Sequence, residues 1–217
     1  MTLKPLYGAI SKQEYWPLSY TPEQVNLEDL LCSLSNQCRF AGNVPHFYSV
    51  LSHSLAVEAM VDFAFSGLFT DRAIFDLQFL ALVHDFTEGV LLDIPRPYKE
   101  AVFLRDGSRF IQFEKYEETL LPIIIRGLGV LDRESATVEE IIEKHWHVIK
   151  TFDTAMLQVE REVLKGIPCD KSMSHFTPEQ KDKALEVFHE FFTMSRADTI
   201  DHARSLFTYL DTSINAS

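Results

Sequence analysis

The sequence is short of cysteine and of positive charge, and each shortage argues against a class of protein. Its three cysteines, Cys32, Cys38 and Cys169, are odd in number and include no Cys-x-x-Cys pair. We therefore expect reduced thiols in a cytoplasmic protein and no disulfide framework or cysteine-based zinc site. With 20 basic and 32 acidic side chains, the net charge is −12. This balance argues against a stable complex with nucleic acid or an anionic membrane surface, because both require a dense basic patch.

Long apolar runs and glycine-rich loops are also missing. No run approaches the roughly 18–20 apolar residues that span a bilayer, and the opening residues 1–5 contain no apolar signal-peptide segment. The sequence holds only eight glycines and has neither a Walker phosphate loop nor a Gly-x-Ser-x-Gly elbow. We expect no membrane span, and we exclude P-loop and α/β-hydrolase chemistry.

What the sequence does contain is the composition of one globular domain with helical patterning. It has 217 residues, 46% of them hydrophobic and 24% charged. Strand signals are scarce, with at most a minor hairpin near residues 40–49, and two prolines mark a connector at residues 93–97. Apolar spacing and capping patterns predict helices over about 27–34 (Asn26 as N-cap), 49–65, 71–85, 107–126, 138–164, from Thr177 onward, and a short one from about Ser195. The sequence thus predicts an all-α domain.

Four polar side chains lie where the helical spacing predicts burial. His53, His84 and Asp153 each continue the apolar stripe of a separate predicted helix, and Asp85 directly follows His84. A buried carboxylate must be paired, protonated or bound to a cation. Taken singly, each residue is more often a hydrogen-bonded core residue than a ligand. Together, two imidazoles and two carboxylates suit a divalent transition metal with open positions, so the residues alone leave a structural and a metal-binding role about equally open.

The order His53 … His84-Asp85 … Asp153 on a helical chain resembles the H…HD…D signature of the HD-domain metal-dependent phosphohydrolases. The similarity extends over about residues 27–164 to the small nucleotidase branch, which includes bacterial 5′-deoxynucleotidases and phage dATP triphosphohydrolases. It is carried by four strings: Cys38-Arg39-Phe40-Ala41-Gly42, residues 47–54, residues 81–88 and residues 93–99. The resemblance implies an HD-domain helical bundle at 27–165, with an N-terminal extension (1–26) and a C-terminal helical extension (166–217) packed on the core.

The resemblance also implies roles for the acidic and histidine residues. Glu88 would orient the attacking water or shuttle its proton, and Asp93 would protonate the leaving oxygen or hold the connector. The metal would be Co²⁺, Zn²⁺ or Mn²⁺, with Mg²⁺ as an option at the phosphates, and it would lower the pKa of water to about 7. The four residues that would hold it are His53, His84, Asp85 and Asp153.

A nucleotide site in a protein of net negative charge must be locally positive. Arg39 resembles the arginine of the branch that contacts phosphate or sugar, and Phe40 takes a position where other members often carry tryptophan, so that its ring would stack on the base or deoxyribose. The other cations near the motif are Arg96, Lys99 and Lys150. For Arg96 and Lys150, an ordinary surface position is an equally good interpretation.

From the resemblance we expect metal-dependent hydrolysis of phosphate from deoxynucleotides, favouring a dATP triphosphohydrolase (dATP to deoxyadenosine) of a phage diaminopurine-DNA pathway. The alternatives are a 5′-deoxynucleotidase acting on dNMPs and a non-catalytic HD protein that binds nucleotide. Oxidative chemistry at a two-iron site is disfavoured, because it would need histidines beyond the signature. The same analogy implies a homo-oligomer, a dimer or a hexamer, in the cytoplasm, or in the host cytoplasm if the protein is phage-encoded.

Overall fold

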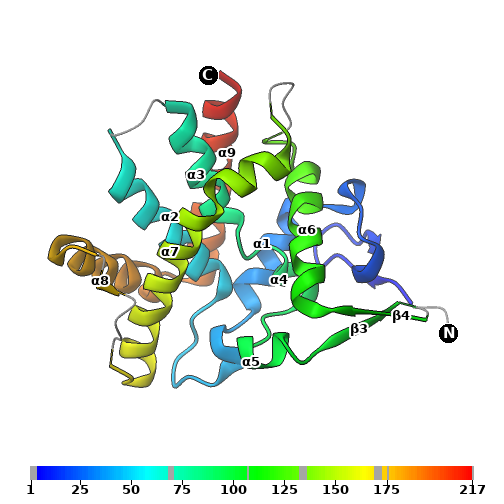
Figure 1. Ribbon diagram of the computed structural model, residues 1–217, viewed down its shortest axis with the longest axis horizontal. Helices are drawn as coiled ribbons and strands as arrows, with labels where there is room; N and C mark the ends of the chain where they lie inside the picture. The colour runs from blue at the N-terminus through cyan, green and yellow to red at the C-terminus, as the bar shows by residue number, and fades with distance from the viewer. Residues whose placement is uncertain are drawn as a thin grey trace.

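The computed structural model describes residues 4–67, 71–106, 108–131, 136–168, 173–174 and 176–216. Helices dominate it, which confirms the predicted all-α class (Figure 1). None of the described helices is long and apolar enough to cross a membrane. The helices are α1 (Leu27–Asn36), α2 (Val50–Phe65), α3 (Asp71–Val83), α4 (Glu88–Leu91), α5 (Arg96–Lys99), α6 (Phe113–Leu128), α7 (Val138–Lys165), α8 (Pro178–Thr193) and α9 (Arg196–Ala216).

The predicted capping signals coincide with the observed helix starts. The Asn26 side chain accepts a hydrogen bond from the backbone N–H of Asp29, 3.1 Å away, and opens α1. Thr137 and Glu140 form a reciprocal capping box at the start of α7, and an equivalent box from Thr177 opens α8. Such caps satisfy N–H groups that have no partner within the helix, which is why short local patterns locate these helix starts.

The described residues include two antiparallel hairpins, one before α1 and one between α5 and α6, and the second corrects a prediction. The strands are β1 (Leu6–Tyr7) with β2 (Glu14–Tyr15), and β3 (Phe103–Asp106) with β4 (Arg109–Gln112). A helix was expected over 107–126, but α6 begins only at Phe113, and Gly107 lies outside the described residues. Leu104 pairs with Ile111 and both pack on the core, while Phe110 lies on the opposite face with 67% of its surface exposed. This two-residue alternation is that of a strand.

Two other helix boundaries differ from expectation, and the segment near 40–49 agrees with the prediction of at most a minor hairpin. The third helix ends at Val83 and not at Asp85, so residues 84–87 form a turn before α4. Near 40–49 the described chain shows only an isolated bridge between Cys38 and Ser49, beside a 3₁₀ turn at Arg39–Gly42. The C-terminal helix α9 is long, because Ala203, Leu210 and Ile214 continue its buried stripe.

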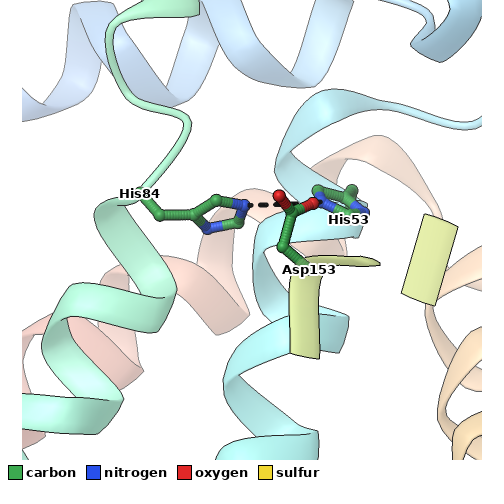
Figure 2. A group of neighbouring side chains, drawn as sticks. All are labelled: His53, His84 and Asp153. Carbon is green, nitrogen blue, oxygen red and sulfur yellow. Dashed lines mark hydrogen bonds and ion pairs between the residues drawn. The ribbon is translucent and has the colours of Figure 1, made fainter. Parts of the chain in front are cut away.

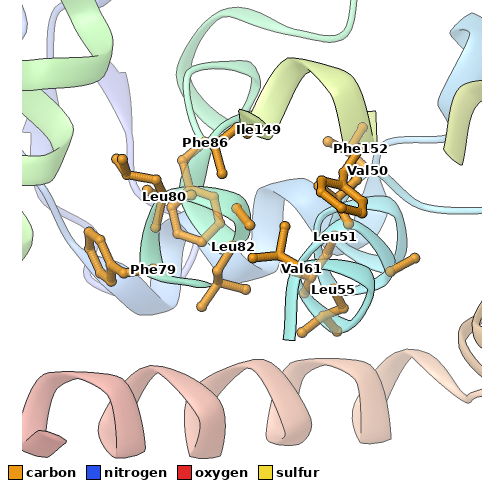
Figure 3. Packing of buried hydrophobic residues seen from close by; sticks show 14 of the residues in the cluster. Val50, Leu51, Leu55, Val61, Phe79, Leu80, Leu82, Phe86, Ile149 and Phe152 are labelled. Carbon is orange, nitrogen blue, oxygen red and sulfur yellow. The ribbon is translucent and has the colours of Figure 1, made fainter. Parts of the chain in front are cut away.

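The core is built around α2, whose side chains are buried almost all round. Val50, Leu51 and Leu55 have no exposed surface, and α3, α7 and α8 pack against them (Figure 3). Each such side chain contributes roughly 1.5–3 kcal/mol of burial energy. Residues from α8 and α9 belong to the same apolar cluster as those of α2. Cys32 and Cys38 are free thiols, while Cys169 lies outside the described residues.

Candidate metal centre

Three elements deliver polar side chains to one buried point. His53 lies in the first turns of α2, His84 directly follows the last residue of α3, and Asp153 lies in the second half of α7. Figure 2 shows the two imidazoles on either side of the Asp153 carboxylate. Oδ1 of Asp153 lies 3.1 Å from His53 Nε2 and 3.9 Å from His84 Nε2. One possible ligand atom from each residue lies within 4.8 Å of the others, a spacing that a single metal ion can bridge.

The fourth predicted ligand, Asp85, lies beside the same group. Its Oδ2 is 3.4 Å from His84 Nε2 and 3.6 Å from His53 Nε2. Burial alone would raise the pKa of Asp85, but His84, His53 and Arg39 together hold this pKa well below its usual range. The pKa of Asp153 is likewise lowered, because Lys150 and His53 outweigh burial. Both carboxylates are therefore ionised and can serve as oxygen ligands.

The tautomer of His84 fits a metal ligand. Its Nδ1 lies 2.7 Å from the carbonyl oxygen of Ala81, and because a carbonyl can only accept, Nδ1 carries the hydrogen. In the neutral ring the lone pair is therefore on Nε2, which is buried and has no hydrogen-bond partner. A buried acceptor without a donor is unfavourable. This one points at carboxylate oxygens, and either a proton or a metal cation at Nε2 satisfies both the nitrogen and those oxygens. The His53-His84-Asp153 group can hold a metal ion.

Glu160, which was not predicted from the sequence, contacts the nitrogen of His53 that faces away from Asp153. Nδ1 of His53 lies 2.6 Å from Oε1 of Glu160, and Oε2 of Glu160 lies 3.4 Å from Nε and Nη2 of Arg39. Burial and Arg39 lower the pKa of His53, but Glu160 and Asp153 raise it, to about 9. The available signal was spacing: Glu160 follows Asp153 by seven residues, two turns along the same inward face.

Arg39 is buried, and its guanidinium forms ion pairs with two carboxylates. Besides Glu160 it faces Asp85, whose Oδ2 lies 3.6 Å from its Nη1. The structure therefore places Arg39 in the wall of the centre, and its contact with substrate stays a prediction. Next to it, Phe40 has a left-handed backbone (φ 58°) and a partly buried ring with Lys165 Nζ 5.0 Å from its centroid.

Glu88 lies close to the centre and is almost fully buried. Its Oε1 accepts a hydrogen bond of 3.0 Å from Lys99, and its Oε2 is buried without a partner. Burial raises the pKa of Glu88 well above its usual range, Asp85 adds to this, and Lys99 opposes it. Lys99 donates a second bond of 2.9 Å to Glu117, another residue that the sequence analysis missed. Lys99 thus bridges two carboxylates.

Asp93 is tied to the same turn through Gln37, a third residue missed from the sequence. The Gln37 side chain donates to the carbonyl oxygen of Glu88 (2.8 Å) and accepts from the backbone N–H of Asp93 (2.9 Å). Burial raises the pKa of Asp93, and its Oδ2 is buried without a partner. Gln37 therefore links the backbones of Glu88 and Asp93, the two predicted catalytic residues.

An open groove of about 580 Å³ lies between α6 and α7 next to the centre. Lys150 joins the two, because it lines the groove and its ammonium contacts Asp153. Its Nζ also lies 5.5 Å from the ring centroid of Trp146. Arg96 is exposed at the start of α5. The groove is lined by Glu118, Pro122, Glu139, Ile142, Glu143, Trp146, His147 and Lys150.

No family model matches the chain. A search of curated proteins finds 30% identity over 181 residues with the uncharacterized protein YfdR of Escherichia coli (strain K12), covering 78% of this chain and 84% of that protein. An identity of this size over most of both chains indicates common descent, and the name of this relative specifies no activity. The chain belongs to the family of YfdR.

Proposed function

We propose that the protein is a metal-dependent phosphohydrolase that acts on deoxynucleotides. The observation that carries this proposal is the buried His53-His84-Asp153 group, in which one possible ligand atom from each residue lies within 4.8 Å of the others. The order of these residues is that of the HD phosphohydrolases. His53, His84, Asp85 and Asp153 would hold one divalent transition metal. Such an ion supplies a Lewis acid that polarises a phosphoryl oxygen and activates water near neutral pH.

Glu88 and Asp93, each with one buried carboxyl oxygen that has no hydrogen-bond partner, supply acid–base groups for hydrolysis. Glu88 has one oxygen fixed by Lys99 and the other free, so it can orient the attacking water and, in its ionised form, accept the proton of that water. Asp93 has a raised pKa and a free Oδ2, so it can carry a proton to the leaving oxygen. Water then adds to phosphorus as the P–O bond to the leaving group breaks.

The groove offers a place for the nucleoside. Lys150 at its inner end would face the phosphates, while the Trp146 ring gives a flat surface for a base. The groove glutamates repel phosphate but accept hydrogen bonds from the amino groups of a base. This distribution of charge favours a substrate with phosphates at the centre and an amino-bearing base in the groove. It is compatible with the preference for dATP that we expect from the resemblance.

A substrate panel tests the proposal. The metal-stripped protein, reloaded with Co²⁺, Mn²⁺ or Zn²⁺, is incubated with dNTPs and dNMPs, and nucleosides and phosphate species are separated by chromatography. We expect deoxyadenosine with inorganic triphosphate from dATP, and no product from Asp153→Ala. If the protein hydrolyses dNMPs but not dNTPs, it is a 5′-deoxynucleotidase and not a dATP triphosphohydrolase. Tight nucleotide binding without turnover by the metal-loaded protein would contradict hydrolysis and favour a non-catalytic role.

A further inference from the structure

Glu160 is a fully buried carboxylate that contacts two residues of the centre at once. Its two oxygens divide between His53 Nδ1, 2.6 Å away, and the Arg39 guanidinium, 3.4 Å away. The first partner comes from the start of α2 and the second from the 3₁₀ turn before it. One side chain of α7 thus joins two segments that belong to the wall of the metal centre.

A buried carboxylate requires strong compensation, because removing it from water costs several kcal/mol. An ordinary structural pair would satisfy it with a close, bidentate arginine. Here the contacts to Arg39 are long, and Arg39 is shared with Asp85 at 3.6 Å. The short contact is the one to His53. The geometry therefore points to the imidazole as the principal partner of Glu160.

The contact fixes which nitrogen of His53 can bind a metal. A carboxylate only accepts, so the hydrogen between the two groups belongs to Nδ1. In the metal-binding form the lone pair is then on Nε2, the nitrogen that lies 3.1 Å from Asp153 and 3.6 Å from Asp85. Carboxylates in this position orient metal-ligating imidazoles and increase their basicity.

We propose that Glu160 is a positioning residue of the metal centre, which fixes the tautomer and orientation of His53 and holds Arg39 against Asp85. The chain of contacts runs from Asp85 through Arg39 and Glu160 to His53. It connects two of the four predicted ligands through two side chains that are not themselves predicted ligands. The inference rests on the metal centre of the proposed function and not on its substrate.

Three substitutions separate the two contacts. Glu160→Gln keeps the shape and offers a carbonyl oxygen to His53, but its amide faces Arg39 in place of a negative charge. Glu160→Leu removes both contacts with little change in volume. Glu162→Gln is the matched control, because it makes the same chemical change on the exposed side of α7, two residues further on.

The experiment is a Co²⁺ titration of the metal-stripped 217-residue chain, in which binding is measured by calorimetry and by the visible absorption of the bound ion. We expect affinity to fall about 10-fold in Glu160→Gln and about 100-fold in Glu160→Leu, with a changed visible spectrum in the leucine variant. Glu162→Gln should match the wild type in both measurements. Circular dichroism identifies a variant that does not fold, and Glu160→Gln decides the test if Glu160→Leu fails to fold.

Wild-type affinity and spectrum in the folded Glu160 variants would overturn the proposal, as would the absence of saturable Co²⁺ binding by the wild type. The substrate is tested separately. If the wild type binds Co²⁺, the Glu160 variants bind it more weakly, and no nucleotide is hydrolysed, then the proposed function fails while the positioning role of Glu160 is supported.

Discussion

Lys99 donates a hydrogen bond of 3.0 Å to one carboxyl oxygen of Glu88, while the other oxygen of Glu88 is buried without a partner. Glu117 fixes the ammonium from its other side at 2.9 Å. This arrangement holds a buried carboxylate in one orientation and leaves half of it available. Both of these contacts of Lys99 are with carboxylates of the protein, and its predicted contact with substrate stays a prediction.

Glu88→Gln should abolish turnover while leaving the metal in place. The amide keeps the shape of the side chain but cannot accept a proton, so we expect kcat to fall by about 10²–10⁴. Metal content per chain, measured by emission spectroscopy, should stay at the wild-type value. Glu114→Gln, on the exposed side of α6, is the control. A near-normal rate in Glu88→Gln would show that Glu88 does not take part in the chemistry.

Asp153→Ala should remove both metal binding and metal-dependent stability. The substitution deletes the oxygen that lies 3.1 Å from Nε2 of His53 and 3.9 Å from Nε2 of His84. A bound metal stabilises the folded chain by mass action, so a chelator should lower the melting temperature of the wild type and have no effect on the variant. Thermal scans with and without EDTA measure this. Retained metal stoichiometry in Asp153→Ala would exclude this residue from the ligand set.

Trp146→Ala should weaken substrate binding without changing the chemical step. The ring lines the groove between α6 and α7, and stacking on a base contributes about 1–3 kcal/mol. We expect KM for a deoxynucleotide to rise about 10-fold or more with kcat nearly constant. Trp146→Phe keeps an aromatic face and should stay close to wild type. An unchanged KM in the alanine variant would place the base elsewhere.

The helix starts and the candidate ligands could be predicted because both leave patterns in short stretches of sequence. The starts of α1, α7 and α8 depend on caps formed within three residues, so the sequence shows them directly. The signature residues were found because polar groups interrupt apolar stripes, and the structure brings them together. The β3–β4 hairpin was missed because Phe110 also fits a helical spacing with Phe113, and strand pairing depends on register with a partner.

The supporting residues of the centre were missed for a different reason. Glu160 meets His53 across 107 positions of sequence, and Gln37 meets Asp93 across 56. Spacing along one helix indicates which face a residue shares, but not which side chain of another helix will lie opposite. Glutamate and glutamine are also common on exposed helix faces, so nothing in their local context distinguishes these buried examples.

Outside the centre, Glu58 should make stability depend on pH. Glu58 is buried on α2. Burial is the largest cause that raises its pKa, the nearby charge of Asp62 raises it further, and a hydrogen bond from Gln78 lowers it, so that the pKa is about 8. Between the unfolded pKa of about 4.5 and the folded value of about 8, the folded chain retains a proton that the unfolded chain has released. The contribution of Glu58 to stability is therefore complete below pH 4.5, decreases as pH rises and levels off above pH 8.

Glu58→Gln keeps a neutral side chain at every pH, so its free energy of unfolding should exceed that of the wild type by about 2–4 kcal/mol at pH 8 and by little at pH 5. Urea unfolding at pH 5, 6.5 and 8 measures the difference, with the exposed Glu190→Gln as a control that should follow the wild type. A difference between Glu58→Gln and wild type that is the same at all three pH values would mean that Glu58 is ionised in the folded protein.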